Sequence, residues 1–181
     1  GLRICFPPDL EGLAARLGRH LRNVVTLKGT IMKISVIGCG YLGAVHAACM
    51  ASLGHDVVGV DTDATKIAAL SAGHSPFYEP GFEDVLQDSL ASGQLRFVAA
   101  PATDELADVD VHFIAVGTPQ SADSGAADLS YVDPAVEAVI AAAGTADHNP
   151  VVVGKSTVPV GTAQNLADRL EAHGITLVWN P

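Results

Sequence analysis

The chain has few of the residues that carry several common chemistries. Its three cysteines, Cys5, Cys39 and Cys49, form no C-x-x-C pair and no cysteine–histidine spacing typical of zinc. Its seven histidines are scattered and show neither H-x-x-x-H nor H-E pairing. We therefore expect no metal site and no histidine-based catalytic triad, and we expect the cysteines to be small buried thiols in a reducing compartment.

Charged residues and long apolar runs are also scarce. Charged side chains make up 17% of the sequence and hydrophobic residues 49%, which argues against disorder and suits the apolar strands of a buried parallel sheet. No apolar run reaches the roughly 18 residues that a membrane-spanning helix needs. The N-terminal stretch also lacks the apolar core of a signal peptide. We therefore expect a cytoplasmic protein with no membrane partner.

Basic residues are concentrated near the N-terminus. Residues 1–30 hold five basic and two acidic side chains, whereas the rest of the chain holds five basic and eighteen acidic ones. Because this larger, acidic part of the chain repels phosphates, we expect no nucleic-acid partner. Met32 stands directly before the first predicted strand. We therefore expect residues 1–31 to be an N-terminal extension, either genuine or upstream of a natural start, and residues 32–181 to be one folded domain.

The most informative segment is Lys33–Gly43. A β-branched run ends there in G-x-G-x-x-G, and an alanine-rich helical pattern follows. Gly38 allows a tight turn out of the strand, Gly40 lets a pyrophosphate approach the backbone, and Gly43 lets the helix pack close to the strand. The N–H groups at the helix start would then face the phosphates of a dinucleotide.

A second strand supplies the acid that completes this fingerprint. The apolar run Val57–Val60 ends in Asp61, about twenty residues after the glycines. Asp61 would accept hydrogen bonds from an adenosine ribose and repel a 2′-phosphate, which favours NAD over NADP. Lys66 follows in the first turns of the next predicted helix, where it could reach the ribose or a phosphate.

Strand and helix patterns alternate along the rest of the chain. The predicted strands are 33–37, 57–60, 95–98, 111–116, 151–154 and 176–179. The predicted helices are 42–53, 64–71, 82–91, 104–107, 132–143 and 162–173, the second of them capped by Thr62 or Asp63. This alternation predicts an α/β fold, a Rossmann-type doubly wound parallel sheet of about six strands with helices on both faces.

Two loops at the carboxyl ends of strands carry hydroxyl groups. Val116-Gly-Thr-Pro119 offers Thr118, and Lys155-Ser-Thr-Val-Pro-Val-Gly-Thr162 offers Ser156 and Thr157. Either loop alone is ordinary turn chemistry. Because ligands bind beyond this edge of an open α/β sheet, two such loops beside the glycine motif indicate ligand contact. We expect Glu79 to favour the start of the helix after it through its charge, with a substrate-side carboxylate as the alternative.

Taken in order, these segments resemble the N-terminal domain of the UDP-glucose/GDP-mannose dehydrogenase family, over residues 32–181. The resemblance implies an NAD-dependent, cytoplasmic, homo-oligomeric enzyme that oxidises the C6 alcohol of a nucleotide sugar to a carboxylate in two hydride transfers. The likeness is greatest to members that convert UDP-glucose to UDP-glucuronate. GDP-mannose and UDP-N-acetylmannosamine dehydrogenases remain alternatives.

The resemblance also assigns residues to NAD. It places the pyrophosphate on the glycine loop, the adenosine beside Asp61 and Lys66, and the nicotinamide beside Thr118 and Thr157. Thr157 would also help to place a water or carboxylate near the reacting carbon, which is a supporting catalytic role. The full set expected to contact the cofactor is Gly38, Cys39, Gly40, Tyr41, Leu42, Gly43, Asp61, Lys66, Val116, Gly117, Thr118, Pro119, Ser156 and Thr157.

One departure from the family concerns catalysis. In the family, a glutamate-containing segment, a dimerising helix and a nucleophilic cysteine follow the position of Asn180-Pro181, and that cysteine forms the thioester of the second oxidation. None of the three cysteines here matches it. We expect the 181-residue chain to be truncated before the dimerisation and substrate domains and to be inactive alone. The alternative is a stand-alone NAD(H)-binding module without catalysis.

Overall fold

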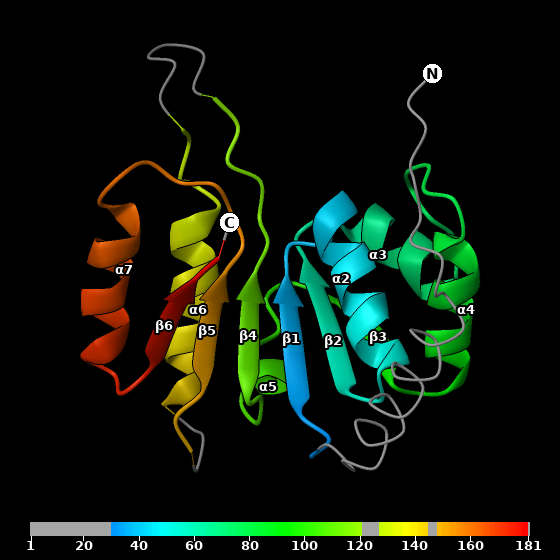
Figure 1. Ribbon diagram of the computed structural model, residues 1–181, viewed down its shortest axis with the longest axis horizontal. Helices are drawn as coiled ribbons and strands as arrows, with labels where there is room; N and C mark the ends of the chain where they lie inside the picture. The colour runs from blue at the N-terminus through cyan, green and yellow to red at the C-terminus, as the bar shows by residue number, and fades with distance from the viewer. Residues whose placement is uncertain (1–29, 121–126, 145–147, 181) are drawn as a thin grey trace, which may run out of the picture. The chain divides into compact units, whose positions relative to one another are not determined.

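A computed structural model describes residues 30–120, 127–144 and 148–180. The strands are β1 (Lys33–Ile37), β2 (Asp56–Asp61), β3 (Leu95–Ala99), β4 (Val111–Ile114), β5 (Val151–Gly154) and β6 (Thr176–Trp179). The helices are α2 (Tyr41–Ser52), α3 (Ala64–Ser71), α4 (Phe82–Ala91), α5 (Thr103–Leu106), α6 (Val132–Ala143) and α7 (Thr162–Glu171), as Figure 1 shows. The expectation for the N-terminal extension falls almost wholly on residues 1–29, outside the described residues.

The six strands form one parallel sheet in the order β3-β2-β1-β4-β5-β6. This order confirms the predicted doubly wound topology, in which the strand order reverses at the β1–β4 pair. In the register, Ile37 pairs with Val60 on one side and with Ile114 on the other. The three central strands therefore end level with one another, and their carboxyl ends define one edge.

Helices cover both faces of the sheet, as predicted. One buried cluster joins β1, β2 and β3 to α2, α3 and α4, and a second joins β1, β2, β4 and β5 to α5, α6 and α7 (Figure 1). The alanine-rich pattern of α2 has a packing reason, because Ala44, Ala47, Ala48 and Ala51 are fully buried against the first cluster. Small side chains let this helix approach the strands closely. No described helix is both long enough and apolar enough to cross a membrane.

Some predicted boundaries were wrong by one or two residues. The strand predicted to reach Val116 ends at Ile114, and beyond it the Val116 carbonyl accepts a hydrogen bond from a side chain, the Ser156 hydroxyl, at 2.7 Å. The cap of α3 is Asp63 rather than Thr62. Its carboxylate accepts hydrogen bonds from two backbone N–H groups in the first turn, at 3.0 and 3.1 Å.

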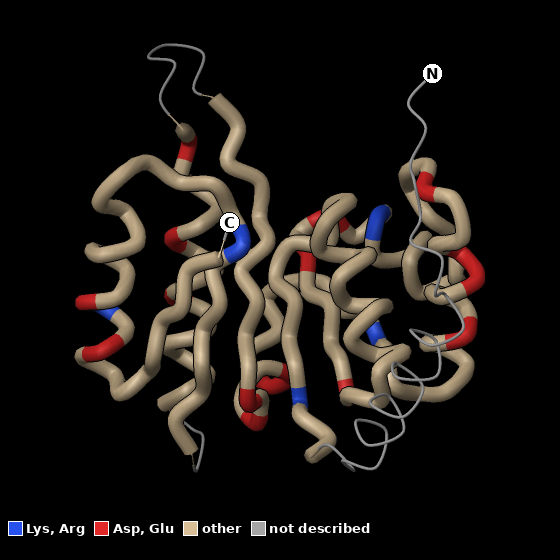
Figure 2. The backbone as a smooth tube through the Cα atoms, viewed as in Figure 1, with Lys and Arg blue, Asp and Glu red and all other residues tan. Residues whose placement is uncertain are grey.

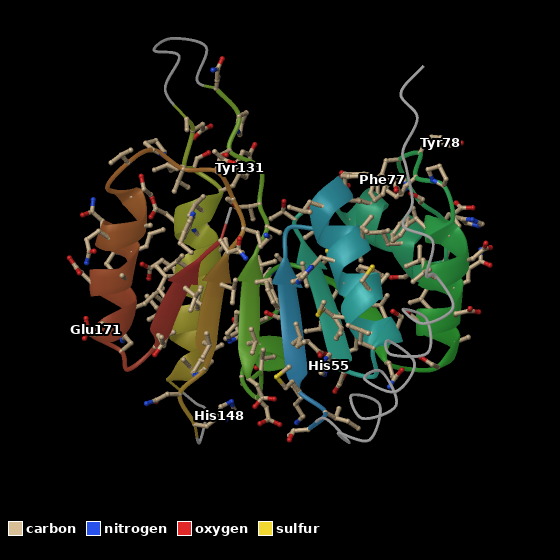
Figure 3. All side chains as sticks on the ribbon, in the orientation of Figure 1. His55, Phe77, Tyr78, Tyr131, His148 and Glu171 are labelled. Carbon is tan, nitrogen blue, oxygen red and sulfur yellow. The ribbon has the colours of Figure 1, made fainter. Side chains whose placement is uncertain are left out.

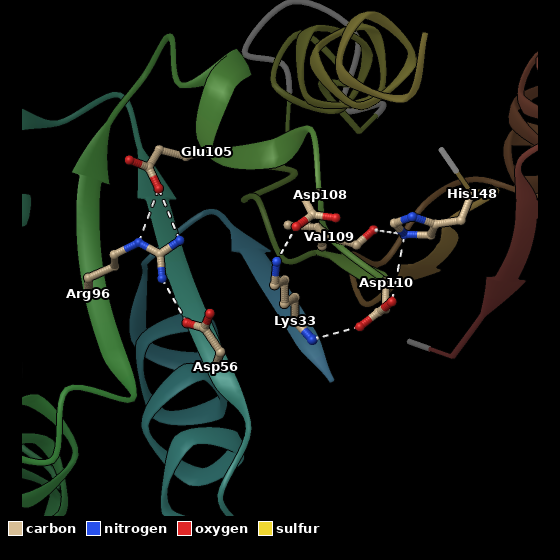
Figure 4. Close-up of polar contacts among 8 residues, drawn as sticks. All are labelled: Lys33, Asp56, Arg96, Glu105, Asp108, Val109, Asp110 and His148. Atoms are coloured by element: carbon tan, nitrogen blue, oxygen red, sulfur yellow. Dashed lines mark hydrogen bonds and ion pairs between the residues drawn. The ribbon is translucent and has the colours of Figure 1, made fainter. Parts of the chain in front are cut away.

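The edge of the sheet at the amino ends of the strands carries a set of ion pairs (Figure 4). Arg96 on β3 bridges Asp56 on β2 at 2.8 Å and Glu105 on α5 at 3.0 Å. Lys33 pairs with Asp108. These pairs are half exposed, so each contributes at most about 1 kcal/mol to stability. Lys33 and Arg96 are thus both paired with carboxylates at this edge.

A histidine is buried inside the sheet. His112 on β4 is fully buried, and its Nδ1 lies 2.8 Å from the Ser35 hydroxyl, while its Nε2 has no partner among the described residues. Burial, with His148 as a smaller cause, lowers the pKa of His112 from 6.5 to about 4. The imidazole is therefore neutral in the folded protein at neutral pH.

This histidine should make the fold acid-sensitive. Between pH 6.5 and about 4 the unfolded chain binds a proton at His112 that the folded chain does not. Stability therefore falls as the pH drops through that window, by about 3 kcal/mol in all. Urea unfolding at a series of pH values measures the loss. His112→Gln should reduce the dependence of the unfolding free energy on pH, whereas His74→Gln, a change at an exposed histidine, should not. An equal pH dependence in both variants would contradict the prediction.

Candidate functional site

A cavity of about 630 Å³ opens at the carboxyl edge of the sheet. Its walls come from the ends of β1, β2 and β4, from the segment after β3, and from α6. Among the residues predicted to contact a cofactor, it is lined by Gly38, Gly40, Asp61, Lys66, Val116, Gly117 and Pro119. Its position and volume match the expected place and size of a dinucleotide site.

The glycine turn is closely packed on one side and open on the other. Gly38 has a φ of +97°, and a Cβ there would lie 2.7–2.8 Å from the backbone of Ala115 and Val116. A Cβ on Gly43 would lie 1.8 Å from the Gly38 carbonyl oxygen, so only glycine lets α2 pack this close to β1. A Cβ on Gly40 would meet nothing within 4 Å. Gly40 thus borders open space at the cavity wall.

The N-terminus of α2 is free to bind an anion. Its N-cap is Gly40, which offers no side-chain hydrogen bond, and its first turn contains no acidic residue. By contrast, α3 is capped by Asp63, and α4 carries Glu83 and Asp84 in its first turn. Among these three helices, only α2 has neither a side-chain cap nor an acidic residue in its first turn, and it begins beside Gly40 at the cavity wall, where the glycine motif predicts a pyrophosphate.

Asp61 lies at the end of β2 and connects three segments of the site. Its Oδ2 accepts hydrogen bonds from the Cys39 N–H and the Lys66 Nζ, both at 2.8 Å, and its Oδ1 accepts one from the Asp63 N–H at 2.9 Å. Burial alone would raise the pKa of this carboxyl, but Lys66 and the two N–H groups outweigh it and hold the pKa below its usual range. Asp61 is therefore ionised and fixed at the cavity wall.

The two hydroxyl loops are joined to each other. Thr118 donates a hydrogen bond from its Oγ1 to the Thr157 carbonyl at 2.7 Å, and Ser156 donates one to the Val116 carbonyl at 2.7 Å. Ser156 is buried, so its hydroxyl is used within the fold. The cavity lining includes none of Thr118, Ser156 and Thr157. The first loop borders the cavity through Val116, Gly117 and Pro119, whereas no residue of the second loop lines it. Their contact with a cofactor remains a prediction.

Four residues of the glycine motif also lie outside the cavity wall: Cys39, Tyr41, Leu42 and Gly43. Cys39 is fully buried, and burial, followed by the charge of Asp61, raises the pKa of its thiol to about 12. Tyr41 and Leu42 are about half exposed, at 52% and 50%. The expectation of buried thiols was wrong for Cys49, which is exposed on α2, and Cys5 lies outside the described residues.

Sequence reasoning missed the far wall of the cavity. This wall consists of Ala100, Pro101, Ala102, Thr103 and Leu106 after β3 and of Ser130, Tyr131, Pro134, Ala135 and Ala138 around the start of α6. Figure 3 shows Tyr131 above the carboxyl ends of the strands. Small apolar residues dominate, which suits a flat ring such as adenine. The available signal was positional, since the segment after β3 leaves the same edge as the glycine loop.

Lysine and arginine are sparse along the described part of the backbone (Figure 2). Of the five basic residues in the described part of the chain, Lys66 and Lys155 follow the carboxyl ends of β2 and β5. Only Lys66 of these five lines the cavity, so a dinucleotide there would meet one cation and the N–H groups of α2 rather than a basic patch. The parallel sheet, the glycine turn at its reversal point and the acid ending β2 define a dinucleotide-binding domain of the Rossmann type.

Comparison with known proteins identifies the family. Residues 32–181 match the model of the NAD binding domain of the UDP-glucose/GDP-mannose dehydrogenase family, and the chain belongs to that family. NAD is accordingly the cofactor of this domain. The family named from the sequence motifs and the predicted fold are both confirmed.

Relatives with named activities are similar over most of this chain. UDP-glucose 6-dehydrogenase of Rhizobium meliloti is 45% identical over 158 residues, covering 83% of this chain and 34% of that protein. A UDP-glucose dehydrogenase structure from Pyrobaculum islandicum gives a TM-score of 0.75 at 42% identity, covering 84% of this chain and 36% of its own. A ternary complex of GDP-mannose dehydrogenase from Pseudomonas aeruginosa gives a TM-score of 0.77 at 35% identity, covering 83% of this chain and 36% of its own. The chain spans about a third of the length of these relatives.

Proposed function

We propose that this chain is the NAD-binding domain of a UDP-glucose 6-dehydrogenase, which oxidises UDP-glucose to UDP-glucuronate in two hydride transfers. The choice of sugar is supported by the identity of 45% and 47% to two UDP-glucose 6-dehydrogenases, against 41% to a GDP-mannose 6-dehydrogenase. The observation that supports cofactor binding most directly is the cavity between the open N-terminus of α2 and the ionised Asp61. The cytoplasm, where free thiols persist, is the compartment we propose.

In this proposal, different residues of the site bind different parts of NAD. The N–H groups at the start of α2 bind the pyrophosphate, and Asp61 with Lys66 binds the adenosine ribose. The loops joined by Thr118 and Ser156 orient the nicotinamide, and Thr157 helps to place a water near the reacting carbon. NAD⁺, when bound, supplies the hydride acceptor, and the protein positions that ring and shields it from water.

Calorimetric titration of the purified chain with NAD⁺ and with NADP⁺ tests the site. We expect NAD⁺ to bind and NADP⁺ to bind at least about tenfold more weakly, because Asp61 repels a 2′-phosphate. Equal binding of both would contradict the assignment of Asp61, and binding of neither would contradict the site as proposed.

The 181-residue chain alone is expected to show no turnover with NAD⁺ and UDP-glucose. In this family the second oxidation needs a thiolate nucleophile, which none of the three cysteines matches. The family's substrate domain lies outside the third of the relatives' length that this chain spans, so we expect neither hydride transfer. We propose that a homo-oligomer of a longer chain carries the activity. NADH absorbance in the presence and absence of the sugar measures turnover, and sugar-dependent NADH formation by this chain would contradict the prediction.

A further inference from the structure

One polar contact of the glycine motif has no part in the site described so far. Tyr41 is the first residue of α2, and its hydroxyl donates a hydrogen bond to the Glu79 Oε2 at 2.6 Å. Glu79 belongs to the loop between α3 and α4, which is 38 residues away in sequence. The expectation that Glu79 would favour the start of α4 misses this contact, in which the carboxylate reaches across to α2.

The ring of Tyr41 is anchored on the same loop. Its ring centroid lies 5.2 Å from that of Phe77 in an edge-to-face arrangement, and Phe77 stacks on Phe82 at 5.3 Å. Phe82 is buried in the core at the start of α4. Figure 3 shows Phe77 beside the upper end of α2. Edge-to-face and stacked rings are favourable geometries, so the aromatic series connects Tyr41 to the core.

The loop that carries Glu79 is itself braced by α4. The Ser75 N–H donates a hydrogen bond to the Glu83 carboxylate at 2.9 Å, and the Gln87 amide donates one to the Gly73 carbonyl at 3.2 Å. The Phe82 N–H bonds to the Glu79 carbonyl at 3.2 Å. Glu79 is therefore presented by a segment with fixed geometry rather than by a free loop.

The glycine turn needs such an anchor. A Cβ on Gly40 would meet nothing within 4 Å, and α2 has no side-chain cap. Tyr41 is the first side chain after this turn and is half exposed, so its contacts with Phe77 and Glu79 are what fix it. An N-terminal turn that frays would lose the aligned N–H groups that a pyrophosphate requires.

We propose that Glu79, acting through Tyr41, is a positioning residue of the cofactor site that holds the first turn of α2 ready for the NAD pyrophosphate. The inference rests on the proposed binding of the pyrophosphate at this helix. Because Glu79 adds negative charge near a phosphate site, its presence there is better explained by positioning than by direct contact with the cofactor.

Three variants separate positioning from charge. Tyr41→Phe keeps the ring and removes the hydroxyl, and Glu79→Ala removes the acceptor and the charge. Glu79→Gln removes the charge but keeps an acceptor. We expect the first two to weaken NAD⁺ binding about threefold to tenfold and Glu79→Gln to stay within about twofold of wild type. The double variant Tyr41→Phe/Glu79→Ala should be no weaker than the weaker single variant.

The neighbouring Tyr78 supplies a matched control. It lies on the same loop, is 89% exposed, and makes no hydrogen bond through its hydroxyl in the described structure. Tyr78→Phe should therefore leave NAD⁺ affinity unchanged. If Tyr78→Phe weakened binding as much as Tyr41→Phe, the effect would belong to the loop in general and the proposal would be overturned.

A spectroscopic readout decides the case even if Glu79→Ala does not fold. The hydrogen bond to the Glu79 carboxylate raises the pKa of Tyr41 above its ordinary value. The phenolate absorbance that is lost in Tyr41→Phe should appear at higher pH in wild type than in Glu79→Gln. An ordinary titration of Tyr41, or unchanged NAD⁺ affinity in Tyr41→Phe, would overturn this inference alone. Failure of wild type to bind NAD⁺ would overturn the cofactor site as well.

Discussion

Replacing Asp61 by alanine is expected to weaken NAD⁺ binding about 30- to 300-fold, which is the loss of two charge-assisted hydrogen bonds to the ribose hydroxyls. The side chain of Asp61 is only 9% exposed, and its pKa lies below the usual range, so it is a fixed, ionised acceptor. It also holds the glycine loop through the Cys39 N–H. Both losses act in the same direction on NAD⁺.

The same substitution should change the choice between cofactors. Without Asp61 the repulsion of a 2′-phosphate disappears, and the Lys66 ammonium, now 2.8 Å from the Asp61 carboxylate, is released to meet that phosphate. We therefore expect NADP⁺ to bind to Asp61→Ala at least as tightly as it binds to wild type. Paired calorimetric titrations with the two cofactors measure the reversal.

Asp56 provides the control for this experiment. It lies at the other end of β2, is ion-paired with Arg96, and has a side chain that is 40% exposed. Asp56→Ala removes the same group from the same strand at the opposite edge, so NAD⁺ affinity should not change. Equal losses in both variants would indicate general destabilisation. Unchanged NAD⁺ binding in Asp61→Ala would contradict the role of Asp61.

The doubly wound parallel sheet could be predicted because the signals were local and agreed with one another. Apolar strands, the helical patterns between them and the spacing from Gly38 to Asp61 all indicated one alternating pattern. With right-handed crossovers, that pattern predicts helices on both faces of a parallel sheet. Boundaries were less certain where long-range contacts decided them. Nothing near Val116 in the sequence indicates that its carbonyl accepts a hydrogen bond from Ser156 or that β4 ends at Ile114.

The cavity brings together some of the residues that the sequence predicts to contact a cofactor, and the backbone explains several of them. Gly38, Gly40 and Asp61 line the cavity, since their positions follow from the turn and the strand end. The far wall and the contact between Tyr41 and Glu79 depend on segments that are distant in sequence. Residue type gave no guide to them: a tyrosine in a glycine motif and a glutamate before a helix each have ordinary local explanations.

Gly43→Ala should lower the stability of the fold, whereas Gly40→Ala should lower the affinity for NAD⁺ and leave stability nearly unchanged, although both glycines belong to one motif. A Cβ on Gly43 would lie 1.8 Å from the Gly38 carbonyl oxygen, so the backbone of β1 or α2 must move. We expect a loss of about 3 kcal/mol in unfolding free energy and a fall of about 6–12 °C in Tm. Thermal and urea unfolding without cofactor measure this change.

A Cβ on Gly40 would meet nothing within 4 Å, and the backbone there has φ −67° and ψ −170°, which alanine adopts without strain. Gly40→Ala should therefore unfold within about 1 kcal/mol of wild type and yet bind NAD⁺ at least about tenfold more weakly, because its methyl group fills the approach to the pyrophosphate. Gly40→Ala with normal affinity would place the pyrophosphate elsewhere. If Gly43→Ala were as stable as wild type, α2 could move away from β1 at little cost in free energy. Close packing would then not explain why this position is a glycine.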